Sequence, residues 1–111
     1  MKPTDVISPK RRWQTITILR DTGNAGESLA LGNWDGSPAL GMRWNGDNNS
    51  DIGNPQSRGQ ATWFIVPEIY WRGLLSTITD SEKMVLAEAV LKNVLAGQKR
   101  AAIWGRKPRD K

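Results

Sequence analysis

Two β-strands joined by a tight turn are encoded in residues 27–45, which read ESLALGNWDGSPALGMRWN. Asp35-Gly36 is a dipeptide that tolerates positive φ angles at both positions, as the two-residue turn of a β-hairpin requires. The strand predicted over residues 39–45 places Met42 and Trp44 on one face, because side chains alternate along a strand. Arg43 is the only charged residue of this strand and points to the opposite face. We therefore expect residues 27–34 and 39–45 to pair as antiparallel strands.

Further strands are expected on either side of this hairpin. Residues 13–19 (WQTITIL) alternate between threonine and isoleucine, which is typical of a half-buried strand rich in β-branched residues. Residues 61–66 (ATWFIV) form a continuous apolar run that is too short for a helix, and we expect a strand buried on both faces. Residues 46–60 are rich in turn formers and predict a long loop, of a length that is often functional.

Two helices are predicted after the strands. In residues 68–78 the apolar side chains recur with the spacing of an amphipathic helix. Thr79-Asp80-Ser81-Glu82 resembles a capping box and opens a second helix over residues 81–96, which Gly97 is expected to end. The second helix carries two apolar stripes. A surface that broad needs cover on more than one side, and a second subunit would supply some of it.

The predicted architecture is therefore α+β. It consists of a four-stranded antiparallel sheet with meander topology, followed by two C-terminal helices that pack on one face of the sheet. With 111 residues the chain fits one domain, which we place at residues 13–98. We expect a homodimer, because the helices offer more apolar surface than this small sheet covers.

The chain contains no histidine and no cysteine. This removes the commonest general base, the commonest metal ligand, thiolate metal sites and disulfides. Asp35, Asp47 and Asp51 do not have the spacing of a calcium loop, so we interpret them as turn residues and predict no metal site. No apolar run is long enough for a signal peptide or a membrane span. We therefore expect a cytoplasmic protein that is not an enzyme, does not bind a membrane and uses no small-molecule cofactor.

Positive charge is concentrated at the two ends of the chain. The formal net charge is +5, but residues 13–98 hold six Lys or Arg against nine Asp or Glu. Residues 1–12 and 99–111 hold ten Lys or Arg against two Asp, and the first of these segments ends in Lys10-Arg11-Arg12. We expect a flexible basic arm and a basic tail, which would neutralise phosphates and release their counterions. The alternative is that these ends are frayed and only keep the protein soluble.

The segment that leads from the long loop into the fourth strand is a second candidate site. There Arg58 is followed by Gly59 and comes shortly before Trp63 and Phe64. Glycine lets backbone N–H groups approach an anion, and the guanidinium group is a forked donor that suits phosphate. The alternative is a structured hairpin loop in which Arg58 is tied to a neighbouring aspartate.

Tryptophans on the predicted strands form a third candidate site. Trp34, Trp44 and Trp63 are interleaved with Arg43, and aromatic faces stack on unpaired bases whatever the base sequence. Tryptophans on apolar strands are usually core residues, so we expect packing roles for two of the three. Trp44 is assigned to the core because it shares a face with the aliphatic residues of its strand.

The order of the predicted elements resembles the positive-cofactor-four family of single-stranded-DNA-binding transcriptional coactivators and its small bacterial relatives. The resemblance spans residues 14–78 and rests on Trp34-Asp35-Gly36, on Met42-Arg43-Trp44, and on Gly59 leading into Phe64-Ile65-Val66. It implies a homodimer in which curved sheets bind single-stranded DNA and the helices make the dimer contact. It also implies backbone contacts for Arg43 and Arg58 and a base-stacking role for Trp63. The longer loop before the last strand and the helix from residue 81 depart from the family pattern.

We therefore predict a non-catalytic protein that binds nucleic acid, single-stranded DNA or RNA, through an open sheet face and the basic arms. The residues assigned to binding are Lys10, Arg11, Arg12, Arg43, Arg58 and Trp63. This prediction requires Arg43 and Arg58 to lie along one path that a polyanion can follow. The alternative is a protein-interaction or inhibitor module of a mobile element with no nucleic-acid role, which the negative charge of residues 13–98 favours.

Overall fold

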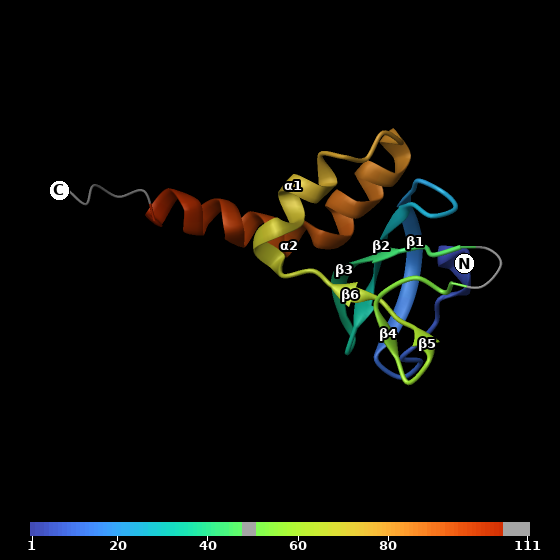
Figure 1. Cartoon of the computed structure of the whole chain (residues 1–111). Coiled ribbons are helices and arrows are strands. Elements are labelled where there is room, and N and C mark those ends of the chain that lie inside the picture. Colours follow the sequence, from blue (N-terminus) through green and yellow to red (C-terminus); the bar gives the residue numbers. More distant parts are fainter. Residues whose placement is uncertain (48–50, 106–111) are drawn as a thin grey trace.

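An antiparallel sheet of four strands forms the centre of the molecule, as the computed structural model shows for residues 1–47 and 51–105 (Figure 1). The strands are β1 (Trp13–Asp21), β2 (Glu27–Trp34), β3 (Ser37–Trp44) and β6 (Phe64–Ile65), and they lie in the order β1-β2-β3-β6. β2 and β3 form the predicted hairpin, and Asp35 and Gly36 in its turn have φ angles of 51° and 84°. The α+β fold and its four-stranded antiparallel sheet are confirmed.

The fourth strand is shorter than the sequence predicts. Residues 61–66 are divided between β6 and β5 (Gln60–Ala61), and β5 pairs with β4 (Gln56–Ser57) in a separate two-stranded sheet. Thr62 and Trp63 lie between these two strands, and the Thr62 carbonyl accepts a hydrogen bond from the Arg43 side chain at 2.5 Å. The predicted loop over residues 46–60 therefore contains a small hairpin of its own.

The helices follow β6. A 3₁₀ turn, η2 (Glu68–Tyr70), leads into α1 (Trp71–Leu75), so the first helix is shorter than predicted. Asp80 caps α2 (Ser81–Gly105) by accepting hydrogen bonds from two backbone N–H groups of its first turn, at 3.0 and 3.1 Å. The prediction that Gly97 ends this helix is wrong. One interior glycine costs only about 1 kcal/mol, and the alanine, lysine and arginine residues around it favour a helix. Residues 106–111 of the predicted basic tail lie outside the described residues.

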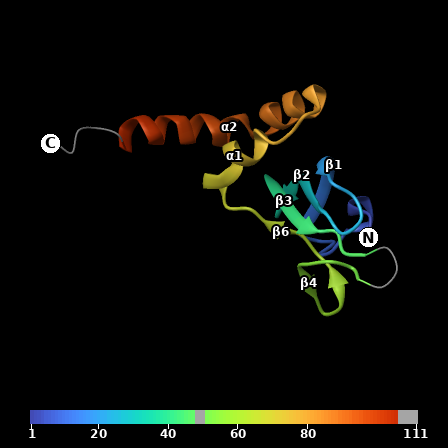
Figure 2. The same cartoon turned by 45° about the horizontal axis from the view of Figure 1, so that its top comes forward.

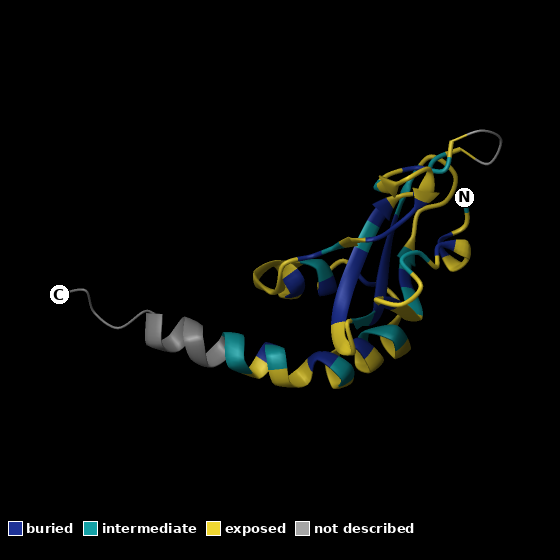
Figure 3. Cartoon of the chain, turned by 90° about the horizontal axis from the view of Figure 1, so that it is seen from below, coloured by how far each residue is buried: buried dark blue, intermediate teal, exposed yellow. Residues whose placement is uncertain are grey.

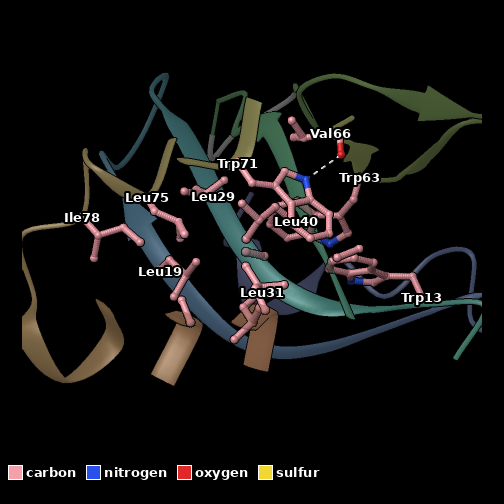
Figure 4. Packing of buried hydrophobic residues seen from close by; sticks show 14 of the residues in the cluster. Trp13, Leu19, Leu29, Leu31, Leu40, Trp63, Val66, Trp71, Leu75 and Ile78 are labelled. Atoms are coloured by element: carbon pink, nitrogen blue, oxygen red, sulfur yellow. Dashed lines mark hydrogen bonds between the residues drawn. The ribbon is translucent and has the colours of Figure 1, made fainter. Parts of the chain in front are cut away.

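The two helices pack on one face of the sheet (Figure 4). Leu31 and Leu40 lie opposite each other on β2 and β3 and are fully buried on this face. Trp71 and Leu75 of α1 and Leu91 of α2 belong to the same cluster. Burying a large apolar side chain contributes about 1.5–3 kcal/mol, so this layer is a major source of stability.

The opposite face of the sheet is covered by two tryptophans. Trp13 and Trp63 lie there with their ring centroids 5.8 Å apart. Gly32 and Gly41 make room for them: an added Cβ would stand 2.6 Å from the Trp13 ring at Gly32 and 3.2 Å from it at Gly41. Val6 of the N-terminal segment is buried in the same layer. The central strands are therefore buried on both faces (Figure 3), and the prediction of an open sheet face is wrong.

Helix α2 is longer than the body it packs on. It runs along one face of the sheet and then projects away from the rest of the molecule (Figures 1 and 2). The molecule is elongated as a result, with extents of 57 × 30 × 25 Å. Within the described ranges, neither this helix nor α1 is long and apolar enough to cross a membrane.

Candidate nucleic-acid interface

The N-terminal segment, residues 1–12, is folded against the sheet. It opens with η1 (Pro3–Asp5), and the amino group of Met1 donates to the backbone oxygen of Asn45 at 2.9 Å. Pro3 and Val6 are buried, and the burial of these apolar residues offsets the entropy lost on ordering the segment. This placement differs from the flexible arm that the polar and basic composition predicts.

The β4–β5 hairpin lies beside this segment. Ser8 pairs with Thr62 in an isolated parallel bridge, and its hydroxyl donates to Gln60 Oε1 at 3.1 Å. Arg58 and Gly59 form the two-residue turn of the hairpin, with φ angles of 52° and 77°. This is the backbone conformation of a type I′ turn, which holds the exposed Arg58 at the tip of the hairpin. In residues 1–47 and 51–105 Arg58 has no carboxylate partner, unlike in the tied-down hairpin that the sequence left as an alternative.

A groove of about 870 Å³ runs between the N-terminal segment and the hairpin. Its lining includes Lys10, Arg11 and Arg12 on one side and Gly59, the neighbour of Arg58, on the other. Asp5 adds one carboxylate to the same lining. Three of the six predicted binding residues, Lys10, Arg11 and Arg12, therefore line one groove, and Arg58 is adjacent in sequence to Gly59 of the same lining.

Arg12 is already engaged within the chain. Its guanidinium group binds the Asp35 carboxylate through two hydrogen bonds, of 2.9 and 2.8 Å, and lies 4.2 Å from the centre of the Trp34 ring. The hydrogen bonds to Asp35 raise the pKa of Arg12, and they lower the pKa of the Asp35 carboxyl. An anion would have to compete with Asp35 for Arg12, whereas Lys10, Arg11 and Arg58 are exposed and have no ion pair within the described residues.

Arg43 does not reach the surface. Its side chain is only 2% exposed, and Nη1 donates to the Thr62 carbonyl at 2.5 Å while Nη2 donates to the Ile52 carbonyl. A weaker bond of 3.4 Å joins Nη1 to the carbonyl of Pro55. Burial lowers the pKa of Arg43, and the charge of Asp51 opposes that effect. The guanidinium group therefore fastens the segment after β3 to the sheet.

The prediction that Arg43 contacts phosphate is therefore wrong. A buried guanidinium group whose hydrogen bonds are made to backbone carbonyls cannot share one surface path with Arg58. The path through both arginines that the sequence-based prediction requires therefore does not exist, and a nucleic-acid site would have to be formed without Arg43. Trp63 is a second correction, because its ring is buried against Trp13 and its Nε1 donates to the Val6 carbonyl at 3.0 Å. It has no free face for a base, so its predicted stacking role is also wrong.

Trp44 and Phe64, which the sequence does not assign to binding, are both exposed. Trp44 is 62% exposed and Phe64 is 52% exposed. Phe64 lies opposite Met42 across β3 and β6, and together with Pro55 these residues line an apolar groove of about 380 Å³. The prediction that Trp44 belongs to the core is wrong. Alternation along β3 identifies its face correctly, but the cover on that face does not extend as far as Trp44.

The acidic residues considered for chemistry occupy turns, as predicted. Asp35 lies in the β2–β3 turn, Asp47 and Asp51 form an isolated bridge, and Asp51 Oδ1 accepts a hydrogen bond from the Gly53 N–H at 2.8 Å. In the described part of the chain, no group of three or more His, Cys, Asp or Glu residues is arranged to hold a metal ion.

No model of a protein family matches the chain, and neither a curated protein nor a solved structure is significantly similar to it. The resemblance to the positive-cofactor-four family therefore stays a prediction from the sequence. Any functional assignment has to rest on the two grooves and on the charges around them.

Proposed function

We propose that this chain is a non-catalytic nucleic-acid-binding protein that holds a single strand of DNA or RNA between the N-terminal segment and the β4–β5 hairpin. The observation that supports this most is that exposed Lys10 and Arg11 line a groove whose other side includes Gly59, the turn residue that follows the exposed Arg58. A nucleic-acid backbone is bound by cations spaced along a path, because each neutralised phosphate releases condensed counterions.

The apolar part of the groove favours a single strand over a duplex. Ile7, Pro9 and Ile52 line the groove together with the cations, and Ile7 is exposed. A single strand can place unstacked bases against apolar side chains while its phosphates meet the cations, whereas a duplex hides its base faces. The groove offers both kinds of contact within one volume.

Fluorescence anisotropy with a labelled oligothymidylate tests this function. Loss of one charge-assisted contact costs about 1.5–3 kcal/mol, so Lys10→Ala and Arg11→Ala should each weaken binding by roughly ten-fold or more. Lys92→Ala is the matched control, because Lys92 is exposed on α2 and its removal changes the net charge by the same amount. Equal weakening by Lys10→Ala and Lys92→Ala would mean that the groove is not the binding site.

A second candidate function, that of a protein-interaction module, is favoured by the apolar groove of about 380 Å³, whose lining includes Trp44 and Phe64. Aromatic residues are enriched in the cores of protein interfaces, and Trp44 and Phe64 are both exposed there. A gel-shift experiment with single-stranded and double-stranded DNA at two salt concentrations separates the two functions. Nucleic-acid binding gives a shift with the single strand that weakens with salt, whereas a pure protein-interaction module gives no shift in any condition.

A further inference from the structure

Two aromatic side chains stand in water at the apolar groove of about 380 Å³, which we call the aromatic groove. Trp44 ends β3, Phe64 begins β6, and each side chain is more than half exposed. Met42, which lies opposite Phe64, and Pro55 add apolar surface to the same lining. Exposed aromatic rings stack on other planar rings, and nucleobases are rings of this kind.

A buried cation belongs to the same groove. Arg43 is among the residues that line it, although its side chain is almost fully buried. Within the described residues its Nε has no hydrogen-bond partner and its guanidinium group forms no ion pair, and the charge of Asp51 does not cancel the effect of burial on its pKa. A buried charge without a partner is costly. An apolar side chain of a protein partner would bring no counter-charge to this groove, whereas a nucleotide brings a phosphate together with an electron-rich ring.

One short segment of the chain borders both grooves. Ile52 lines the groove beside the N-terminal segment, and Asn54 and Pro55 line the aromatic groove. Ile52 and Pro55 are three positions apart, so their Cα atoms are at most about 11 Å apart. The Arg43 side chain donates to the carbonyls of both residues, which fixes this segment to the sheet. A single strand that leaves one groove across this segment therefore reaches the other.

We propose that the aromatic groove binds unpaired bases of the same single strand, with one base stacked on Trp44 and another on Phe64. This inference rests on the proposed function and extends it, because the phosphates elsewhere on the strand are those that Lys10 and Arg11 bind. Stacking needs no particular base, so the aromatic groove adds affinity whatever the base sequence. The buried charge of Arg43 adds an attraction for the strand, since charges interact more strongly where water is excluded.

Fluorescence anisotropy with a labelled oligothymidylate of about 16 nucleotides tests the stacking. Trp44→Ala and Phe64→Ala should each weaken binding by about ten-fold, which is the contribution of one stacked base. Trp44→Phe should keep most of the affinity, because a phenylalanine ring also stacks. Tyr70→Ala is the matched control: Tyr70 is an exposed aromatic residue that lines neither groove, so its removal should leave binding unchanged. Circular dichroism shows whether the variants are folded.

Abasic oligonucleotides show whether bases, and not only phosphates, occupy the aromatic groove. Two such oligonucleotides keep every phosphate but lack the bases of either the 5′ half or the 3′ half. One of them should bind the wild-type chain at least ten-fold more weakly than the full oligonucleotide does. The double variant Trp44→Ala/Phe64→Ala should bind that abasic oligonucleotide and the full one about equally, because it has lost the rings on which the missing bases stack.

The outcomes separate this inference from the proposed function. If folded Trp44→Ala and Phe64→Ala bind as tightly as the wild-type chain, the inference is overturned and the aromatic groove is left to a protein partner. The proposed function stands in that case if Lys10→Ala still weakens binding. A double variant that discriminates against both abasic oligonucleotides as strongly as the wild-type chain also overturns the inference. A wild-type chain without affinity for any of the oligonucleotides overturns the proposed function and the inference together.

Discussion

Replacing the buried Arg43 by methionine should destabilise the fold. Methionine keeps an apolar stem of similar length but leaves the carbonyls of Thr62 and Ile52 without their donors. An unpaired buried polar group costs about 1–3 kcal/mol, so two of them cost about 2–6 kcal/mol. The Nε of Arg43 is buried without a hydrogen-bond partner in the described part of the chain, and removing it relieves some desolvation cost. We therefore expect a loss of about 3 kcal/mol in the free energy of unfolding.

Urea denaturation followed by tryptophan fluorescence measures this loss, because Trp13 and Trp63 are buried in the folded chain. Arg58→Met is the matched control. Arg58 is exposed at the hairpin tip, and its replacement should change the free energy of unfolding by no more than about 0.5 kcal/mol. A loss below about 1 kcal/mol for Arg43→Met would refute the structural role assigned to this arginine. If both variants lost about 3 kcal/mol, the assay would not distinguish buried from exposed arginines.

Two further predictions concern backbone strain and pH. Gly53→Ala should lower the free energy of unfolding by more than about 1 kcal/mol, because Gly53 has a φ of 79° and an added Cβ would stand 2.0 Å from the backbone oxygen of Trp44. Thermal melts should show no such loss for Gly73→Ala, where an added Cβ meets open space. The hydrogen bonds from Arg12 lower the pKa of the Asp35 carboxyl below its ordinary value of 3.8. The pair therefore stabilises the fold above pH 3.8, and this stabilisation is lost as the pH falls through the lowered pKa. Carboxyl NMR titration should show a higher midpoint for Asp35 in Arg12→Ala than in the wild-type chain, and equal midpoints would contradict the pairing.

The hairpin of β2 and β3 could be predicted because its signals are local. Asp35-Gly36 specifies the turn, and the alternation on either side specifies which residues share a face. Alternation does not say how far the cover on a face extends, and for this reason it predicts a core position for Trp44, which is exposed. Trp63 shows the opposite error, since its burial depends on Val6 from a distant part of the chain.

The role of Arg43 could not be read from the sequence for a different reason. Charged residues on strands are usually exposed, and the groups that bind this one are backbone carbonyls, which any residue provides. The groove between the N-terminal segment and the β4–β5 hairpin could be predicted only in part. The run Lys10-Arg11-Arg12 identifies one of its sides, but the other side exists only because the N-terminal segment folds back beside the β4–β5 hairpin. That fold-back depends on contacts between residues far apart in the sequence, such as Ser8 and Gln60.

The salt dependence of oligonucleotide affinity tests the proposed interface most directly. Each phosphate of a single strand that a cation neutralises contributes about 0.7 to the slope of log affinity against log salt concentration. If Lys10, Arg11 and Arg58 each bind one phosphate, the triple variant Lys10→Ala/Arg11→Ala/Arg58→Ala should have a slope that is shallower than the wild-type slope by about 2. A wild-type affinity that does not change with salt, or the same slope for the wild-type chain and the triple variant, would contradict the proposal.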